Sequence, residues 1–385
     1  MARQQLPPQI KTRDVVDRRT GKPVRRYVVT VDVAPPGEPR KQVKKRFTTE
    51  REARSFLATT QAEVARGTYV AASSTTVRQA VQDWLDTRQL KPTTLQSYTV
   101  VLQALVDENG DTQVQKLSEA DVVRMLRRLR SGKSPGRKKW TARSCNLLLT
   151  LTKAVLESEK RQGRVVRNVA ADIRPMERDA RTAKTLTHEQ MLTVLDHECR
   201  DRHLWTLALH GLRRGEIAGL RWENVDLDAR TITIAETRVA VGKEVLTSTP
   251  KSKQSRRTLP LPQDVVDVLK AARRAQRAER LKAGSMYQGG EHLACDEFGK
   301  PYHPDKLSRD WREMIKALGV DRVRLHDARH TCGTLMHLRG VPITVIAAWL
   351  GHSSAAFTMA TYTHSQDDAL AAAGVTLTAR VSEQM

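Results

Sequence analysis

Residues 77–164 carry apolar side chains at helical spacing throughout, and this long stretch restricts the possible folds more than any other feature. Apolar residues recur three and four positions apart in separate runs near residues 77–85, 95–105, 122–129 and 147–156. Ser118 and Thr141 precede two of these runs and are suited to cap the N-termini of helices. The pattern predicts four or five packed helices in a domain that spans residues 74–168.

The first 70 residues have a different pattern. Three runs have the β-branched or alternating character of strands, namely residues 10–16, 27–33 and 43–47. Thr48 or Thr49 is placed to cap a helix that ends near Ala65, because Gly67 follows. Residues 1–70 are therefore predicted to form a small α+β domain with a three-stranded sheet and one helix.

The segment after the helical domain is basic. Its cationic residues are Arg167, Arg174, Arg178, Arg181 and Lys184, with Pro175 among them. This composition fits an extended linker at residues 169–184 that crosses DNA between two domains, and it fits a solvated charged loop equally well. Thr187 and Gln190 then form a capping box that opens a third domain, residues 185–385. This domain is predicted to be mainly helical with a small β-hairpin sheet, so the whole chain is multidomain.

The net charge of +23 and the isoelectric point near 10.3 predict a polyanionic partner. DNA fits because neutralised phosphates release condensed counterions, although the charge alone also suits RNA or an anionic membrane surface. No apolar run is long enough to span a bilayer, and no apolar targeting segment follows the initial Met. The four cysteines lie far apart, which indicates reduced thiols in a cytosolic protein. They are Cys145, Cys199, Cys295 and Cys332.

The third domain contains a set of residues suited to holding a phosphodiester while a phenol oxygen attacks it. The candidate catalytic residues are Arg213, Lys251, His326, Arg329, His352 and Tyr362. Arginine binds phosphate oxygens through a planar fork of N–H donors, so the two arginines are candidate phosphate ligands. Glu216 lies on the same helical face as Arg213 and is expected to support the helix start. The alternative is an exposed Arg–Glu pair of little energetic value.

Other interpretations apply to several of these residues. Lys253 lies two positions after Lys251 and shares its face in a strand, and both lysines are also suited to simple phosphate contacts. A zinc site is the alternative for the histidines, but the sequence has no H-E-x-x-H motif and no cysteine pair. His330 fits a structural histidine packed against its own helix. Tyr362 also fits a half-buried aromatic residue with an ordinary hydrogen bond.

In order and spacing, these residues resemble the tyrosine recombinase (phage integrase) family. The motifs that carry the resemblance are Gly-Leu-Arg-Arg-Gly-Glu at 211–216, Leu-His-Asp-Ala-Arg-His at 325–330, Leu-Gly-His at 350–352 and Thr-Tyr at 361–362. The resemblance implies that Tyr362 is the nucleophile and that Lys251 protonates the departing 5′ oxygen. It also implies that residues 1–70 resemble an arm-site-binding domain and that the helical domain resembles a core-binding domain.

The implied reaction needs an activated phenol, whose pKa near 10 makes it a poor nucleophile until positive charge lowers that value. Arg213, Arg329 and the histidines would supply this charge and stabilise the phosphorane. The resemblance implies a 3′-phosphotyrosyl intermediate that conserves bond energy, so no cofactor, ATP or metal is expected. The absence of a Gly-x-x-x-x-Gly-Lys-Ser/Thr phosphate loop agrees with this expectation.

The sequence therefore predicts a site-specific recombinase that integrates or excises a phage or mobile element. The implied partners are double-stranded DNA attachment sites, a homotetramer on DNA, a host DNA-bending protein and a directionality factor, all in the bacterial cytosol. Two rival functions are weighed against this prediction. A type IB topoisomerase uses the same nucleophile chemistry, and a catalytically silent DNA-binding protein would keep only the fold.

Overall fold

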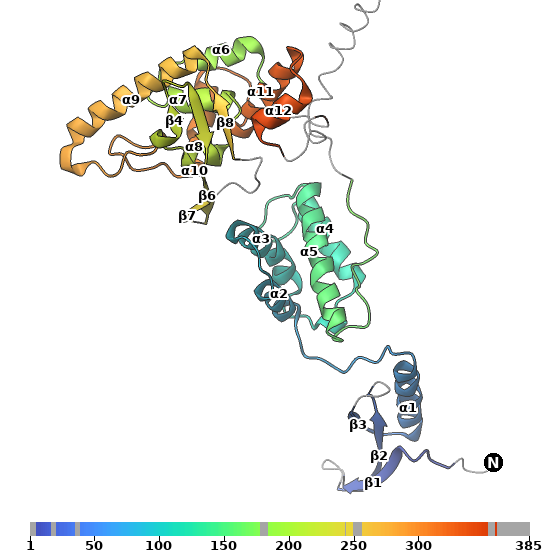
Figure 1. Cartoon of the computed structure of the whole chain (residues 1–385). Coiled ribbons are helices and arrows are strands. Elements are labelled where there is room, and N and C mark those ends of the chain that lie inside the picture. The colour runs from blue at the N-terminus through green and yellow to red at the C-terminus, as the bar shows by residue number, and fades with distance from the viewer. Residues whose placement is uncertain are drawn as a thin grey trace, which may run out of the picture. The chain divides into compact units, whose positions relative to one another are not determined.

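The computed structural model describes residues 5–16, 21–34, 39–177, 184–242, 244–248, 256–352 and 359. The chain divides into two compact units, residues 1–179 and 180–385. The first unit contains two separate hydrophobic cores, one under a small sheet and one inside a helical bundle. Figure 1 labels the elements of both units.

The first core lies between a three-stranded antiparallel sheet and a single helix. The sheet has the order β1 (Ile10–Val16), β2 (Pro23–Asp32), β3 (Gln42–Phe47), and α1 (Glu50–Ala65) follows it. Thr49 caps α1 because its side chain accepts from the backbone N–H of Glu52, whose carboxylate accepts in return from Thr49. Leu57 of α1 packs with Val29 and Val31 of β2. The predicted sheet and helix are confirmed.

The second core belongs to four helices. These are α2 (Val77–Asp86), α3 (Pro92–Asn109), α4 (Glu119–Ser131) and α5 (Ala142–Arg161), with a short 3-10 turn at Val114–Lys116. Ser118 and Thr141 cap α4 and α5, as their positions predicted. The largest fully buried side chains of this core are leucine and methionine residues, among them Leu102, Met125 and Leu148. The predicted bundle is confirmed, with four helices.

Residues 165–176 pack against this bundle, so the first half of the predicted basic linker is folded structure. Ile173 belongs to the bundle core, and the Asn146 side chain exchanges two hydrogen bonds with the backbone of Met176, at 2.8 and 2.7 Å. The Lys153 ammonium donates to two carbonyls of the same segment, at 2.7 and 2.9 Å. The sequence pattern did not predict this packing, because the residues that anchor the segment lie about one helix length away in α5. Residues 178–183 lie outside the described residues.

The second unit is mainly helical. Its described helices are α6 (His188–Asp196), α7 (Arg202–Leu209), α8 (Arg214–Gly219), α9 (Gln263–Ala283), α10 (Pro304–Ala317), α11 (Leu325–Leu338) and α12 (Ile343–Leu350), with 3-10 turns at Trp222–Asn224 and Gly284–Met286. Thr187 caps α6 through the predicted capping box with Gln190. Trp311 of α10 is fully buried and meets Trp205 of α7 edge-on, with ring centroids 5.8 Å apart. One continuous core therefore holds the helices that surround the candidate site.

Two small antiparallel sheets accompany these helices. One has the order β4 (Val225–Asp226), β5 (Thr231–Ile234), β8 (Arg257–Pro260), and the other is a hairpin of β6 (Thr237–Val241) and β7 (Glu244–Ser248). Alternation places Ile232, Ile234 and Leu259 in the core. The predicted fold class is confirmed, and the domain has one more small sheet than the sequence indicated.

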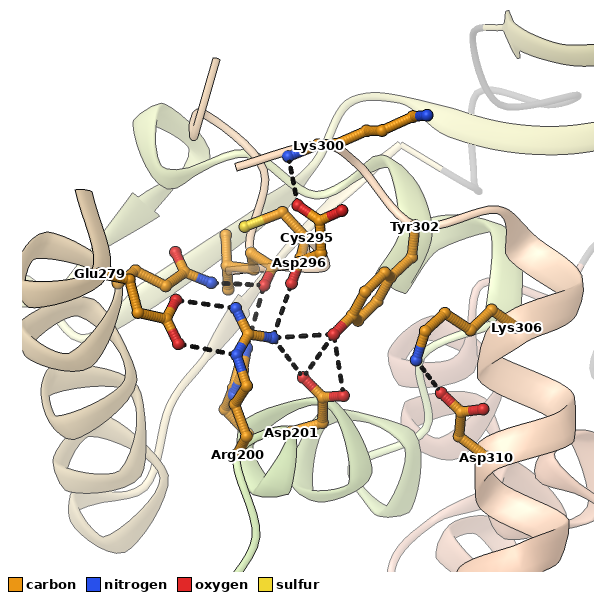
Figure 2. A network of polar contacts seen from close by, with 12 residues as sticks. Arg200, Asp201, Glu279, Cys295, Asp296, Lys300, Tyr302, Lys306 and Asp310 are labelled. Atoms are coloured by element: carbon orange, nitrogen blue, oxygen red, sulfur yellow. Dashed lines mark hydrogen bonds and ion pairs between the residues drawn. The ribbon is translucent and has the colours of Figure 1, made fainter. Parts of the chain in front are cut away.

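A polar network centred on Arg200 joins the start of α7, the C-terminal part of α9 and the loop before α10 (Figure 2). The Arg200 guanidinium donates to both carboxylate oxygens of Glu279 at 2.8 Å, to the Cys295 carbonyl at 2.7 Å and to the Tyr302 hydroxyl at 2.8 Å. Burial raises the pKa of Tyr302, and the nearby Asp201 carboxylate raises it further. The phenol therefore stays protonated and donates to Asp201 at 3.2 Å.

We expect Arg200→Met to destabilise the second unit, because the replacement removes every hydrogen bond that the guanidinium donates while keeping much of the stem. The free energy of unfolding should fall by about 2 kcal/mol, since charge-assisted hydrogen bonds are lost from a partly exposed group. Scanning calorimetry measures the change as a lower melting temperature. Arg309→Met is the control, because the Arg309 side chain is 59% exposed and its ion pair is with the neighbouring Asp310. An equal melting temperature for the two variants would show that the network adds nothing.

Candidate active site

Arg213 and Glu216 form a buried polar pair at the start of α8. The backbone N–H of Arg213 donates to one carboxylate oxygen of Glu216 at 2.8 Å, and its guanidinium donates to the other at 2.7 Å. The Glu216 side chain is only 1% exposed, whereas that of Arg213 is 33% exposed. The alternative of an exposed surface pair is therefore wrong, and Glu216 supports the helix start as predicted.

Arg257 of β8 is a second partner of Glu216, which sequence reasoning missed. Its guanidinium donates to both carboxylate oxygens of Glu216 at 3.1 Å, and its side chain is 7% exposed. Burial alone would raise the pKa of Glu216, but hydrogen bonds from Arg257 and the charges of Arg257 and Arg213 lower it below its usual value. Glu216 is therefore an anion that holds two arginines from different elements.

Arg329 lies in α11 and is 2% exposed. One of its terminal nitrogens donates to the Gly211 carbonyl at 2.6 Å, and the other donates to the Leu350 carbonyl. Gly211 has a φ of +93°, and a Cβ at this position would lie 2.7 Å from a methyl carbon of Leu350. Glycine is required here because only a residue without a side chain lets α12 approach Arg329 in this way.

Three arginines bind successive carbonyls at the C-terminal end of α12. The pairs are Arg257 with Trp349, Arg329 with Leu350 and Arg213 with Gly351. The carbonyl end of a helix carries partial negative charge and lacks internal partners, so cations are favoured there. Gly351 ends the helix in the left-handed conformation, and the backbone N–H of His352 donates to the Ala347 carbonyl at 2.9 Å. Both candidate phosphate ligands, Arg213 and Arg329, therefore contact the end of α12, close to His352 in the chain.

The three histidines of this region have lowered pKa values. Burial lowers the pKa of His352 to about 4, and the charges of Arg329 and Arg213 contribute. The pKa of His326 is also lowered, first by desolvation and then by His330 and Arg329. The His326 and His330 rings meet edge-on with centroids 5.2 Å apart. At neutral pH these imidazoles are therefore neutral, and each has one N–H to donate.

We expect the melting temperature to fall as the pH decreases from about 6.5 towards 4. The folded-state pKa of His352 is lower than its unfolded value, so the unfolded chain binds protons first in this window and acid favours unfolding. His352→Gln removes one such group and should flatten the pH dependence, as thermal unfolding at several pH values measures. His188→Gln, in α6, serves as the control. A slope unchanged by His352→Gln would refute this origin.

The structure brings together Arg213, Arg329 and His352 through the carbonyl contacts above, and His326 shares α11 with Arg329. Lys251, Lys253 and Tyr362 lie outside the described residues. Within the described ranges, no group of three His, Cys, Asp or Glu side chains is arranged to hold a metal ion. In that same part of the chain, no helix has the length and apolar content needed to cross a bilayer.

A signal for Arg257 was present in the sequence. Arg257, Leu259 and Leu261 stand at alternate positions, and the two leucines are 5% and 6% exposed. An arginine on the inward face of a strand needs a buried anion. Glu216 was a suitable partner because the apolar residues Ile217 and Ala218 follow it directly.

Comparisons with known proteins agree with this site. A family model described as the phage integrase family matches residues 184–369. A protein described as "Tyrosine recombinase XerC-like", from Caldanaerobacter subterraneus subsp. tengcongensis, is 32% identical over 166 residues, which cover 40% of this chain and 42% of that protein. An integrase of Streptomyces ambofaciens is 29% identical to this chain over 331 residues. The match covers 82% of this chain and 82% of that integrase.

Among solved structures, the Tn1549 transposon integrase in complex with transposon right end DNA is similar in fold. The TM-score is 0.64 at 17% identity, with 79% of this chain and 100% of that chain covered. The match to the XerC-like relative covers less than half of the length of that relative. The family match covers the arginines, the histidines and the conformation-setting glycines described above, and residues 184–369 of the chain form a phage integrase domain.

Proposed function

We propose that this chain is a site-specific DNA recombinase that cleaves and rejoins DNA strands through a 3′-phosphotyrosyl intermediate. The observation that carries the proposal is the convergence of Arg213, Arg329 and His352 at the end of α12. Two arginines with neutral histidines beside them suit a phosphodiester, which is anionic and gains further negative charge in the transition state. Arg213 is the more exposed of the two, so we expect it to meet the DNA first.

In the proposed reaction, the Tyr362 phenol, whose pKa is lowered by the surrounding positive charge, loses its proton to solvent. Its oxygen then attacks the scissile phosphorus and the bond to the 5′ oxygen breaks. Lys251, rather than Lys253, gives its proton to the departing 5′ oxygen, and His326 and His352 donate hydrogen bonds to the phosphorane. The 5′ hydroxyl of the partner strand then attacks the phosphotyrosine and releases Tyr362. Each step exchanges one phosphoester bond for another, so no external energy source enters the balance.

The N-terminal domain is proposed to bind separate DNA arm sites through the face of its sheet that points away from α1. Register places Arg13 opposite Arg26 and Val28 opposite Arg46 on this face, and these side chains line a shallow cavity of about 380 Å³. Cations on all three strands suit an anionic phosphate backbone. The bundle of α2 to α5 is proposed to bind the core site, with the part of the basic linker that comes after residue 177 following it along the DNA.

The partners follow from the same proposal. Recombination joins two DNA sites, so we propose that the chain acts as a homotetramer on paired attachment sites in the bacterial cytosol. A host DNA-bending protein and a directionality factor would set the geometry and the direction of the reaction. The element moved would be a phage genome or another mobile element. We propose that the reaction integrates and excises this element.

The test uses DNA that flanks the gene of this protein, nicked near candidate crossover points so that the cleaved end diffuses away. Wild-type protein is incubated with this DNA in EDTA and run on a denaturing gel. A DNA-linked protein band supports the proposal and shows that no divalent metal is needed. Confirmed binding without a linked band would favour a DNA-binding protein without catalysis. Repeated relaxation of supercoiled plasmid without joining of two sites would favour a topoisomerase.

A further inference from the structure

An arginine-lined pocket lies next to the candidate active site and is not used by the roles described so far. Its volume is about 640 Å³. Four arginines line it from three parts of the fold: Arg214 at the start of α8, Arg312 in α10, and Arg322 and Arg324 in the segment before α11. Ser308 adds a hydroxyl, and His326 of the candidate active site belongs to the same lining.

The pocket carries an excess of positive charge. Arg214 donates to Asp305 at 2.7 Å and Arg324 donates to both oxygens of Asp327 at 2.6 Å, so these two cations already face carboxylates. Arg312 and Arg322 are exposed and have no ion-pair partner among the residues that the structure describes. Two uncompensated guanidinium groups in one concave lining favour an anionic ligand.

The elements that carry these arginines are fixed relative to each other. Trp311 is fully buried directly before Arg312, and its indole N–H donates to the Val323 carbonyl at 2.9 Å. Val323 lies between Arg322 and Arg324 and is itself buried. The wall of the pocket is therefore a rigid junction of α10 with the segment before α11, so a ligand would meet arginines on a preformed surface.

We propose that this pocket binds a backbone phosphate of the DNA strand close to the scissile phosphate. The inference rests on the proposed function, because the shared residue His326 places the pocket beside the scissile phosphate site. A DNA strand presents one phosphate per about 3.4 Å of helix axis, so a strand held at Arg213 and Arg329 carries further phosphates past its neighbours. The contact would fix the register of the strand without reading its sequence.

The first test measures binding to a short labelled duplex between about 50 and 200 mM salt. The double variant Arg312→Gln/Arg322→Gln should reduce the slope of log affinity against log salt by about 0.9 for each phosphate that the protein no longer neutralises. The control Arg309→Gln/Lys316→Gln removes the same charge from α10 outside the pocket and should leave the slope near the wild-type value. Equal slopes for the two double variants would overturn the proposal.

The second test places single neutral methylphosphonates near the bond that is cleaved in the covalent assay. A methylphosphonate at one position beside the cleaved bond should weaken DNA binding by the wild type and by the control variant. The same methylphosphonate should not weaken binding by Arg312→Gln/Arg322→Gln. If the methylphosphonate and the double substitution reduce DNA affinity additively at every position, the pocket assignment is overturned. Absence of any covalent product in the wild type would instead count against the proposed function, while the salt slopes still decide the pocket. Melting temperatures should confirm that the variants fold, as expected for exposed positions.

Discussion

Tyr362→Phe is expected to abolish covalent attachment to DNA while leaving DNA affinity within about threefold of wild type. The replacement removes only the phenol oxygen, and the arginines that bind phosphate are unchanged. Loss of a nucleophile lowers the rate of an enzyme reaction by a factor on the order of 10⁵ to 10⁶. The measurement is the rate of formation of the DNA-linked band on nicked DNA, together with an affinity measured on the same DNA.

Tyr287→Phe is the matched control for this experiment, because Tyr287 follows the short turn after α9 and is not one of the candidate catalytic residues. It should form the covalent product at the wild-type rate. A linked band from Tyr362→Phe would mean that another residue is the nucleophile, and sequencing the DNA-bound peptide would identify it. If Tyr362→Phe instead loses DNA binding while Tyr287→Phe keeps it, Tyr362 acts in folding or in docking on DNA.

Elements with local signals were predictable from sequence. The helix starts at Thr49, Ser118, Thr141 and Thr187 follow from capping residues whose partners are three positions away. The strands of the N-terminal sheet follow from alternation with period two. These features were confirmed because their energetics depend on a few neighbouring residues, which a single sequence displays.

Features that depend on distant residues were not predicted. Arg257 is 41 positions from Glu216 and 92 from Trp349, and no local pattern connects the three. The packing of residues 165–176 on α5 likewise depends on Asn146, 30 positions before Met176. The candidate residues were found because their types and order form a motif, whereas the carbonyl contacts that orient them appear only in the folded chain.

Glu216→Gln is expected to destabilise the second unit and to slow DNA cleavage. Glu216 is an almost fully buried anion between Arg213 and Arg257, and an amide places an NH₂ group among their N–H donors. Removal of one partner from a buried ion pair costs about 3–5 kcal/mol. Because the same carboxylate orients Arg213, the rate of covalent product formation should fall by about 10²-fold. Calorimetry measures the first change and the nicked-DNA assay measures the second.

Glu223→Gln is the control, because the Glu223 side chain is 70% exposed in the same domain, and it should change stability by less than about 0.5 kcal/mol. The double variant Glu216→Gln/Arg257→Met separates positioning from general destabilisation. If Glu216 acts through both arginines, the double variant should lose less stability than the sum of the single losses, since it no longer leaves the buried Arg257 guanidinium without its anion. Its cleavage rate should stay low while DNA affinity is retained, because Arg213 still lacks its carboxylate. Additive losses of stability would mean that Glu216 and Arg257 act independently, which the shared hydrogen bonds at 3.1 Å contradict.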